Sequence, residues 1–326
     1  MKMEQVSSNC FAVLNEKNRV CDANSGLVNL AGGMVIDTQS DLPHARKMMK
    51  LFGKVWSAVP DRVVNTHEDA DHVFGNQLFE GAEIIGHRSL PARMAQVSEP
   101  EEFEHLMHLA TDPISGPQMQ SIHPGVVAMV KQLGEDYNFG GVELVAPTTL
   151  FDDRLEVNLD GSAVHIIHVG PCHQVGDAIV WMPDEGVLFA GDVLFRLCTP
   201  MGWAGTFRKW SETLDMIVNE LKPEVIVPGH GPICGLEGAT EMKEYLQYVE
   251  KESRTYFDRE IAASEAASSI DLGPYADWLC PERIYMNIER AYREFRGETF
   301  DEPWDHLEIF DEMYAVAMAR GIAPNF

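Results

Sequence analysis

The chain has few basic residues. Its 326 residues include 25 Lys and Arg against 51 Asp and Glu, which gives a formal net charge of −26. Nucleic acids and anionic membranes are bound through basic patches, so this deficit argues against both as partners. The sequence instead predicts an acidic surface that repels other copies and keeps the protein in solution, and it favours small molecules as binding partners.

Long hydrophobic runs are also missing. No apolar stretch reaches the roughly 18 residues that a membrane helix needs. Residues 1–8 contain no apolar segment followed by a cleavage site, so they do not have the pattern of a signal peptide. We therefore expect a cytoplasmic protein.

Several chemical motifs are absent as well. The six cysteines, at positions 10, 21, 172, 198, 234 and 280, form no Cys-x-x-Cys pair, and we expect reduced, buried thiols. Cys172 precedes a histidine and is interpreted as a small residue that shapes its loop, with a reactive thiol as the alternative. No Gly-x-Ser-x-Gly sequence suggests a serine hydrolase.

Potential metal ligands are concentrated in one short segment. Within six residues the chain contains His67, Asp69, Asp71 and His72. The segment follows the apolar run Val63-Val64 and precedes residues 73–79, which can start a helix. A loop between a strand and a helix can turn these side chains into one cavity, and imidazole with carboxylate suits zinc, iron or manganese.

Three later segments repeat this arrangement. His173 lies in Gly170-Pro171-Cys172-His173, Asp192 in Ala190-Gly191-Asp192, and His230 in Pro228-Gly229-His230-Gly231. Each segment follows an apolar run that is typical of a strand, so we expect the ligands to come from neighbouring strand ends.

With these four motifs in order, the sequence resembles the metallo-β-lactamase fold superfamily over residues 9–245. The family pattern is H-x-H-x-D-H, a lone His, an Asp after Gly, and a late Gly-His-Gly. The resemblance implies an α/β fold, a four-layer αββα sandwich, and two divalent metal ions. It implies that His67, Asp69 and His173 bind one metal, that Asp71, His72 and His230 bind the other, and that Asp192 bridges them. It also implies a bridging water as the nucleophile, with Asp71 as the candidate catalytic residue.

Asp69 departs from the family pattern, because most members have His at its position. With Asp71 and Asp192 it supplies three negative charges, which favours harder ions such as iron or manganese over zinc. The resulting H-x-D-x-D-H sequence is similar to the H-x-E-x-D-H motif of the di-iron branch, the flavodiiron oxygen reductases. No flavodoxin domain follows His230 in this chain.

The chain is expected to have two parts. Residues 1–245 would form the metallo-β-lactamase-like domain, in which residues 97–140 interrupt the strand rhythm and predict a helical insert that acts as a lid. We interpret His105, His108 and His123 as surface or packing residues of this insert. Residues 246–326 predict a helical extension that packs on the domain, and a homodimer interface is the alternative for its aromatic and methionine faces.

Substrate contacts are predicted near the metal motifs. Arg196 follows Asp192 closely enough to clamp a carboxylate, with a surface ion pair as the alternative. Trp203 and Phe207 could form an apolar wall, with core packing as the alternative. We interpret His165 and His168 as structural residues that support the site, and Asn76 as a helix cap.

The leading hypothesis is a metal-dependent hydrolase of a small ester, lactone, thioester or amide. The first alternative is a di-iron, oxygen-dependent oxidoreductase on the same fold. The second is a member that binds metal and ligand without turnover.

Overall fold

Short apolar and β-branched runs form two sheets. The computed structural model describes residues 1–299 and 302–326. The first sheet has its strands in chain order: β1 (Lys2–Gln5), β2 (Cys10–Leu14), β3 (Ser25–Val28), β4 (Met34–Ile36), β5 (Arg62–Val64), β6 (Glu83–His87) and β7 (Thr149–Phe151). Its pairs are antiparallel from β1 to β4 and parallel from β4 to β7.

The second sheet is built from the middle of the chain. Its order is β12 (Val225–His230), β11 (Val187–Phe195), β10 (Ala178–Met182), β9 (Ser162–His168) and β8 (Arg154–Leu159). All of its pairs are antiparallel except the parallel pair of β11 and β12. Every residue of β11 is buried, as expected for a strand that is covered on both faces.

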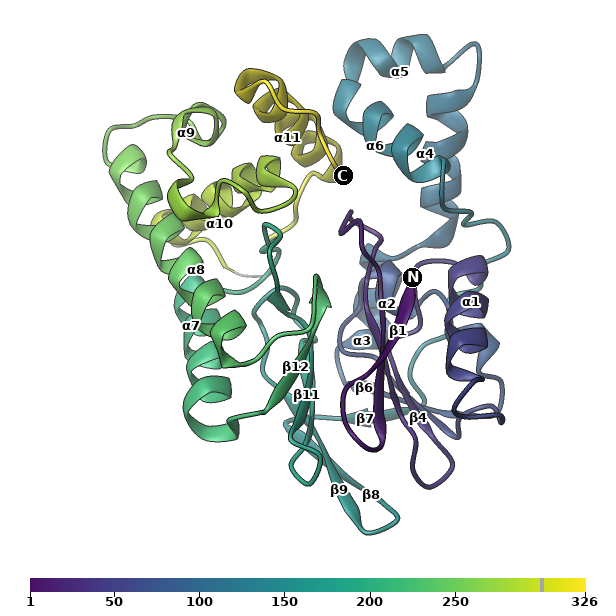
Figure 1. The fold of residues 1–326 in the computed structure, drawn as a ribbon. Helices are drawn as coiled ribbons and strands as arrows, with labels where there is room; N and C mark the ends of the chain where they lie inside the picture. Colours follow the sequence, from purple (N-terminus) through teal and green to yellow (C-terminus); the bar gives the residue numbers. More distant parts are fainter. Residues whose placement is uncertain (300–301) are drawn as a thin grey trace.

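The two sheets pack face to face, with helices on both outer sides (Figure 1). Val28, Ile85, Val180 and Phe189 belong to the apolar layer between the sheets. Outside the first sheet, α1 (Leu42–Phe52) buries Met48 and Phe52. Outside the second sheet lie α7 (Phe207–Met216), which continues into η2 (Ile217–Leu221), and α8 (Leu236–Phe257). The predicted four-layer αββα sandwich is confirmed.

The segment between β6 and β7 is helical. It contains α3 (Leu90–Val97), α4 (Pro100–Thr111), α5 (Gly116–Ile122) and α6 (Pro124–Gly134). Each helix has Pro at its first or second position, where a missing N–H costs nothing. Helices α4, α5 and α6 stand at one end of the sandwich, whereas α3 lies beside the first sheet (Figure 1).

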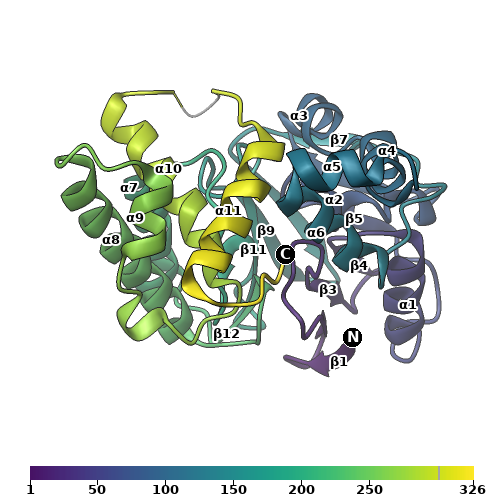
Figure 2. The same ribbon diagram turned by 90° about the horizontal axis from the view of Figure 1, so that it is seen from above.

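The C-terminal part covers the same end of the molecule. It contains α9 (Ala263–Ser269), η3 (Gly273–Tyr275), η4 (Pro281–Arg283), α10 (Ile284–Arg296) and α11 (His306–Arg320). Helices α11 and α6 lie side by side, with His123 Nδ1 2.7 Å from Asp311 Oδ2 (Figure 2). The predicted boundary between residues 245 and 246 falls inside α8, and the division of the chain into two parts stays a prediction.

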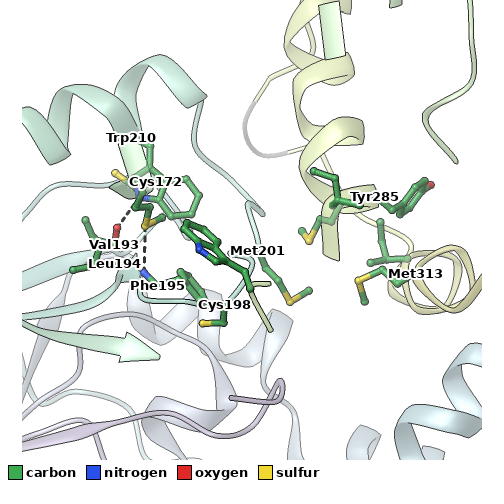
Figure 3. Close-up of a cluster of buried hydrophobic side chains, with 14 of the residues drawn as sticks. Cys172, Val193, Leu194, Phe195, Cys198, Met201, Trp210, Tyr285 and Met313 are labelled. Carbon is green, nitrogen blue, oxygen red and sulfur yellow. Dashed lines mark hydrogen bonds between the residues drawn. The ribbon is translucent and has the colours of Figure 1, made fainter. Parts of the chain in front are cut away.

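Beneath this end, an apolar cluster connects the second sheet to the extension. Figure 3 shows Phe195, Cys198 and Met201 between Trp210 on one side and Tyr285 on the other. The indole N–H of Trp210 donates to the carbonyl of Val193 at 2.8 Å. All six cysteines are buried and free, as expected from the sequence. Among the described residues, no helix has the length and apolar character that crossing a bilayer requires.

Candidate metal centre

The first motif lies between a strand of the first sheet and a short helix. Strand β5 ends at Val64, and α2 (Ala70–Val73) follows, so that Asp71 and His72 lie in its single turn. The helix therefore begins at Ala70 rather than at Val73, where the sequence suggested a start. His67, Asp71 and His72 are buried, and Asp69 is about one-fifth exposed.

The other three predicted ligands come from the second sheet. His173 follows β9, Asp192 lies within β11, and His230 ends β12. Because β11 and β12 run parallel, their carboxyl ends meet. A glycine is required beside Asp192, since a Cβ at Gly229 would lie 1.9 Å from Asp192 Oδ1.

The structure brings all seven predicted ligands together. They form three groups, each with ligand atoms within 4.8 Å of one another: His67, Asp69 and His173; His67, His72 and Asp192; and Asp71, His72 and His230. Asp192 Oδ2 is also 3.5 Å from His173 Nε2 and 3.4 Å from His230 Nε2. Asp192 thus lies between the other two groups, where a bridging carboxylate would be.

Asp69 reaches its group despite its short side chain. Its Oδ2 is 3.0 Å from His173 Nε2 and 3.8 Å from His67 Nε2. The other carboxylate oxygen, Oδ1, accepts a hydrogen bond of 2.7 Å from the amide of Gln174. Gln174 therefore fixes one oxygen of Asp69 and leaves the other facing the imidazoles.

Other neighbours orient the imidazoles. His72 Nδ1 lies 2.8 Å from Asp37 Oδ2, and the same oxygen accepts from the hydroxyl of Thr66. His173 Nδ1 donates to the carbonyl of Met201 at 2.5 Å. Such partners fix the ring orientation and leave Nε2 of each ring for a metal.

The donor atoms fit a metal. Within the part of the chain that the structure describes, four buried atoms find no hydrogen-bond partner: His67 Nε2, His72 Nε2, Asp71 Oδ2 and Asp192 Oδ1. Unsatisfied buried polar atoms are costly, and cations coordinated by all of them would remove that cost. Burial, together with the neighbouring His72, holds the pKa of His67 well below its usual range, so this ring is neutral and able to coordinate.

Carboxylates give the centre an affinity for positive charge. Burial lowers the pKa of His72, but Asp71, Asp192 and Asp37 outweigh this effect and raise it well above its usual range. The carboxylates that favour a protonated His72 also attract a metal ion, because both carry positive charge. Imidazole with carboxylate is a donor set suited to zinc, iron or manganese.

A cavity of about 460 Å³ opens beside these ligands. Helices α4 and α6 supply Phe103 and Met129 to its walls, and the C-terminal extension supplies Trp304 and Leu307. The insert thus lies over the metal centre, as a lid would, and the extension completes the cover. Trp203 also lines the cavity, where the sequence predicted a substrate contact.

Two predicted substrate contacts lie elsewhere. The side chain of Arg196 forms an ion pair with Glu241 of α8 and borders a separate hollow with Glu237. Phe207 begins α7, and its side chain is buried in the core. Neither residue is among those that line the cavity beside the metal centre, so the structure gives no support to these two predicted substrate contacts.

The remaining predicted residues have structural contacts. His168 stacks on His87 with ring centroids 3.7 Å apart, and His165 faces Glu156. Asn76 does not cap a helix but donates to Asn65 Oδ1 and to the carbonyl of Val145. Neither His105 nor His108 belongs to a metal-binding group among the described residues, and neither does His123.

Sequence reasoning missed several residues of the site. Asp37 follows β4 and could have been found by the strand-end argument that identified Asp192. Gln174 is adjacent to His173, but nothing in the sequence indicates its bond to Asp69. Trp304 and Arg283 have no local signal, because only the packing of the extension brings them to the cavity.

Proteins of known function are similar to this chain in sequence. A linear primary-alkylsulfatase of Pseudomonas sp. (strain ATCC 19151) is 23% identical over 302 residues, which cover 83% of this chain and 56% of that protein. The type 2 metallo-beta-lactamase of Bacteroides fragilis is 32% identical over 116 residues, which cover 34% of this chain and 47% of that protein. The chain thus spans about half the length of these curated relatives.

Solved structures share the fold. The sec-alkylsulfatase Pisa1 from Pseudomonas sp. aligns with a TM-score of 0.64 at 14% identity, over 93% of this chain and 52% of its own. A metallo-beta-lactamase family protein of Thermus thermophilus aligns with a TM-score of 0.60 at 18% identity, over 89% of this chain and 94% of its own. The family model of the metallo-beta-lactamase superfamily matches residues 18–230, which include every ligand described above. With the sandwich and the ligand groups in agreement, the chain belongs to the metallo-beta-lactamase superfamily.

Proposed function

We propose that the protein is a metal-dependent hydrolase of a small ester, lactone, thioester or amide that carries an apolar group. The observation that supports this most is the position of the metal-binding groups on the floor of a cavity with apolar walls. Such a cavity binds the apolar part of a substrate and holds its polar bond beside the metals.

Each side chain has a role in this proposal. His67, Asp69 and His173 would hold one metal and Asp71, His72 and His230 the other, with Asp192 between them. When bound, two divalent ions activate a water and polarise the bond to be cleaved. The lid and the extension exclude bulk water, and Gln174 and Asp37 keep Asp69 and His72 in place.

The names of the similar proteins suggest further types of bond that this protein should be tested for cleaving. One is named as a sulfatase of linear primary alkyl compounds and another as a metallo-beta-lactamase. A sulfate ester of an alkyl chain therefore belongs in the substrate panel with carboxylic esters and cyclic amides.

The second candidate function is di-iron, oxygen-dependent oxidation. It is favoured by Asp69, whose carboxylate lies among His67 and His173 where the family usually has imidazole. The kinship with the di-iron branch stays a prediction. A member that binds metal without turnover is the third candidate, and it predicts metal but no product.

Metal analysis and a substrate panel separate these candidates. We expect protein purified with and without oxygen to contain two divalent ions per chain and to hydrolyse at least one ester or amide. His230→Ala should abolish turnover, whereas His165→Ala, which alters a histidine outside the metal groups, should retain it. Iron with an oxygen-dependent optical change, and no hydrolysis, would favour the oxidoreductase instead.

The cytoplasmic location and a homodimer also remain predictions. Cell fractionation tests the first and light scattering of the purified chain tests the second.

A further inference from the structure

One buried cation at the cavity has no carboxylate partner. Arg283, in η4 of the extension, is 1% exposed and lines the cavity beside the metal centre. Its guanidinium donates to two backbone carbonyls, Asn18 at 3.1 Å and Thr199 at 3.4 Å. Its Nε has no hydrogen-bond partner, and no carboxylate oxygen of residues 1–299 or 302–326 lies within 4.0 Å of its nitrogens.

The other arginine of the cavity is different. Arg93 Nε lies 3.2 Å from the buried carboxylate of Glu68, which neutralises it. A buried guanidinium without such a counter-charge is costly, because removal of a charge from water is not offset by an ion pair. Arg283 therefore keeps an unpartnered nitrogen in the wall of the cavity that would hold the substrate, and this nitrogen is available to an anion.

We propose that Arg283 binds an anionic group of the ligand, a sulfonate, sulfate or carboxylate attached to an apolar chain. This inference rests on the proposed function, since it names the substrate class of that site. A guanidinium is the side chain best matched to such oxyanions, because its N–H groups form parallel hydrogen bonds with two oxygens.

The surrounding charges are consistent with an anion at this position. Asp69, Asp71 and Asp192 line the cavity within the metal-binding groups, where bound metal ions would offset their charge. Glu102 and Glu302 line it at solvent-exposed positions, where their charge is screened. Arg283 is buried, so its attraction for an anion acts at a lower effective dielectric constant. The apolar chain would lie against walls that include Phe103, Met129 and Leu307.

Ligands that cannot be hydrolysed test this proposal without turnover. We would titrate the full-length protein, at its measured metal content, with 1-octanesulfonate, octanoate and 1-octanol by calorimetry. The two anions should bind at least tenfold more tightly than the alcohol, and comparison of the anions distinguishes a sulfur oxyanion from a carboxylate. Arg283→Met should weaken the anions by about ten- to a hundredfold and the alcohol by less than about twofold.

Arg290→Met is the matched control. Arg290 is an equally buried arginine of the same extension, but it does not line the cavity, so its replacement should leave the preference for anions unchanged. If Arg283→Met does not fold, Arg283→Lys, which keeps the charge but loses the two-pronged geometry, should show an intermediate preference.

Several results would overturn the proposal: equal affinity of the wild-type protein for anions and alcohol, an unchanged preference in Arg283→Met, or an equal loss of preference in Arg290→Met. The substrate panel of carboxylic esters, cyclic amides and an alkyl sulfate tests hydrolysis itself. Hydrolysis without anion preference would refute this inference alone, and anion preference without any hydrolysis would refute the proposed function alone.

Discussion

At the scale of single residues, Asp69 decides the charge of the metal centre. It provides a carboxylate where an imidazole would leave the ligands with one negative charge fewer, which favours harder ions. We expect Asp69→His to raise the share of zinc over iron and manganese in the purified protein and to raise hydrolytic activity. Elemental analysis measures the first effect, and Asp184→His, at an exposed position, is the control. Identical metal content in wild type and Asp69→His would show that Asp69 does not select the metal.

Gln174 acts on the same centre through Asp69. Its amide holds Oδ1 of that carboxylate at 2.7 Å, and loss of such an orienting partner costs about ten- to a hundredfold in metal affinity. Gln174→Leu should therefore weaken one metal site and spare the group of Asp71, His72 and His230. Competition with a chelator measures both affinities. Gln132→Leu, in α6, should change neither, and an equal loss at both sites in Gln174→Leu would contradict this role.

Glu294 introduces a pH dependence far from the metals. Burial raises its pKa to about 7, against contributions from the N–H of Phe207 and from Arg290 that lower it. Because the folded state prefers the protonated carboxyl, its stabilisation is complete below the unfolded value of 4.5 and is lost as the pH rises through about 7. Glu294→Gln should thus be more stable than wild type at pH 8, by up to about 3 kcal/mol.

Thermal unfolding across this pH range tests the prediction. The advantage of Glu294→Gln should grow from pH 4.5 to pH 7 and then level off. Glu298→Gln, which alters a partly exposed carboxylate that pairs with Arg296, is the control. A constant difference between Glu294→Gln and wild type at all pH values would contradict a titration of Glu294.

At the scale of elements, helix α6 of the insert packs closely against α11. A Cβ at Gly125 would lie 2.2 Å from the carbonyl oxygen of Phe310, so only glycine allows α6 to approach this closely. Gly125→Ala should separate the two helices and destabilise the protein by about 1–3 kcal/mol. Hydrogen exchange should rise in both α6 and α11. Gly134→Ala, at the end of the same helix, meets only the tip of Met107 and should change little.

Patterns of local sequence predicted the elements that carry the ligands. The apolar runs before His67, His173, Asp192 and His230 are strands. His67 and His173 lie in the loops after β5 and β9, whereas β11 and β12 continue through Asp192 and His230. The residues after position 97, where the alternation of strands and helices is interrupted, form helices. Such features depend on neighbouring residues, so one sequence is enough to predict them.

Contacts between distant segments were beyond prediction. The directions of Arg196 and Phe207 depend on α8 and on the core, and Arg283 reaches the cavity only because η4 packs beside the loops of Asn18 and Thr199. The predicted boundary at residue 245 lies inside α8, a single helix that packs on both α7 and α10. Periodicity describes one element at a time and contains no information on which elements meet.

At the scale of the whole molecule, the metal centre joins the two sheets. His67 to His72 follow the first sheet, whereas His173, Asp192 and His230 belong to the second. Bound metal should therefore stabilise the packing of the two halves, by about 2.7 kcal/mol when free metal is at a hundred times its dissociation constant. Treatment with a chelator should lower the melting temperature, and added zinc or manganese should restore it.

The variant His230→Ala tests whether this effect comes from the centre. It should melt at a lower temperature than the metal-loaded protein and respond much less to the chelator. His165→Ala should respond like wild type. An unchanged melting temperature of wild type after complete removal of metal would show that the centre does not connect the sheets.

The cavity walls and the metal ligands come from separate stretches of the chain. The ligands lie in the strands of the second sheet, in the loops after strands and in α2, whereas the helical insert and the extension supply most of the walls. Mutations in the walls can therefore alter which molecules are accepted while the chemistry is retained. Proteins with this arrangement can therefore evolve a new substrate specificity through single mutations in the walls, and each intermediate protein keeps its catalytic centre.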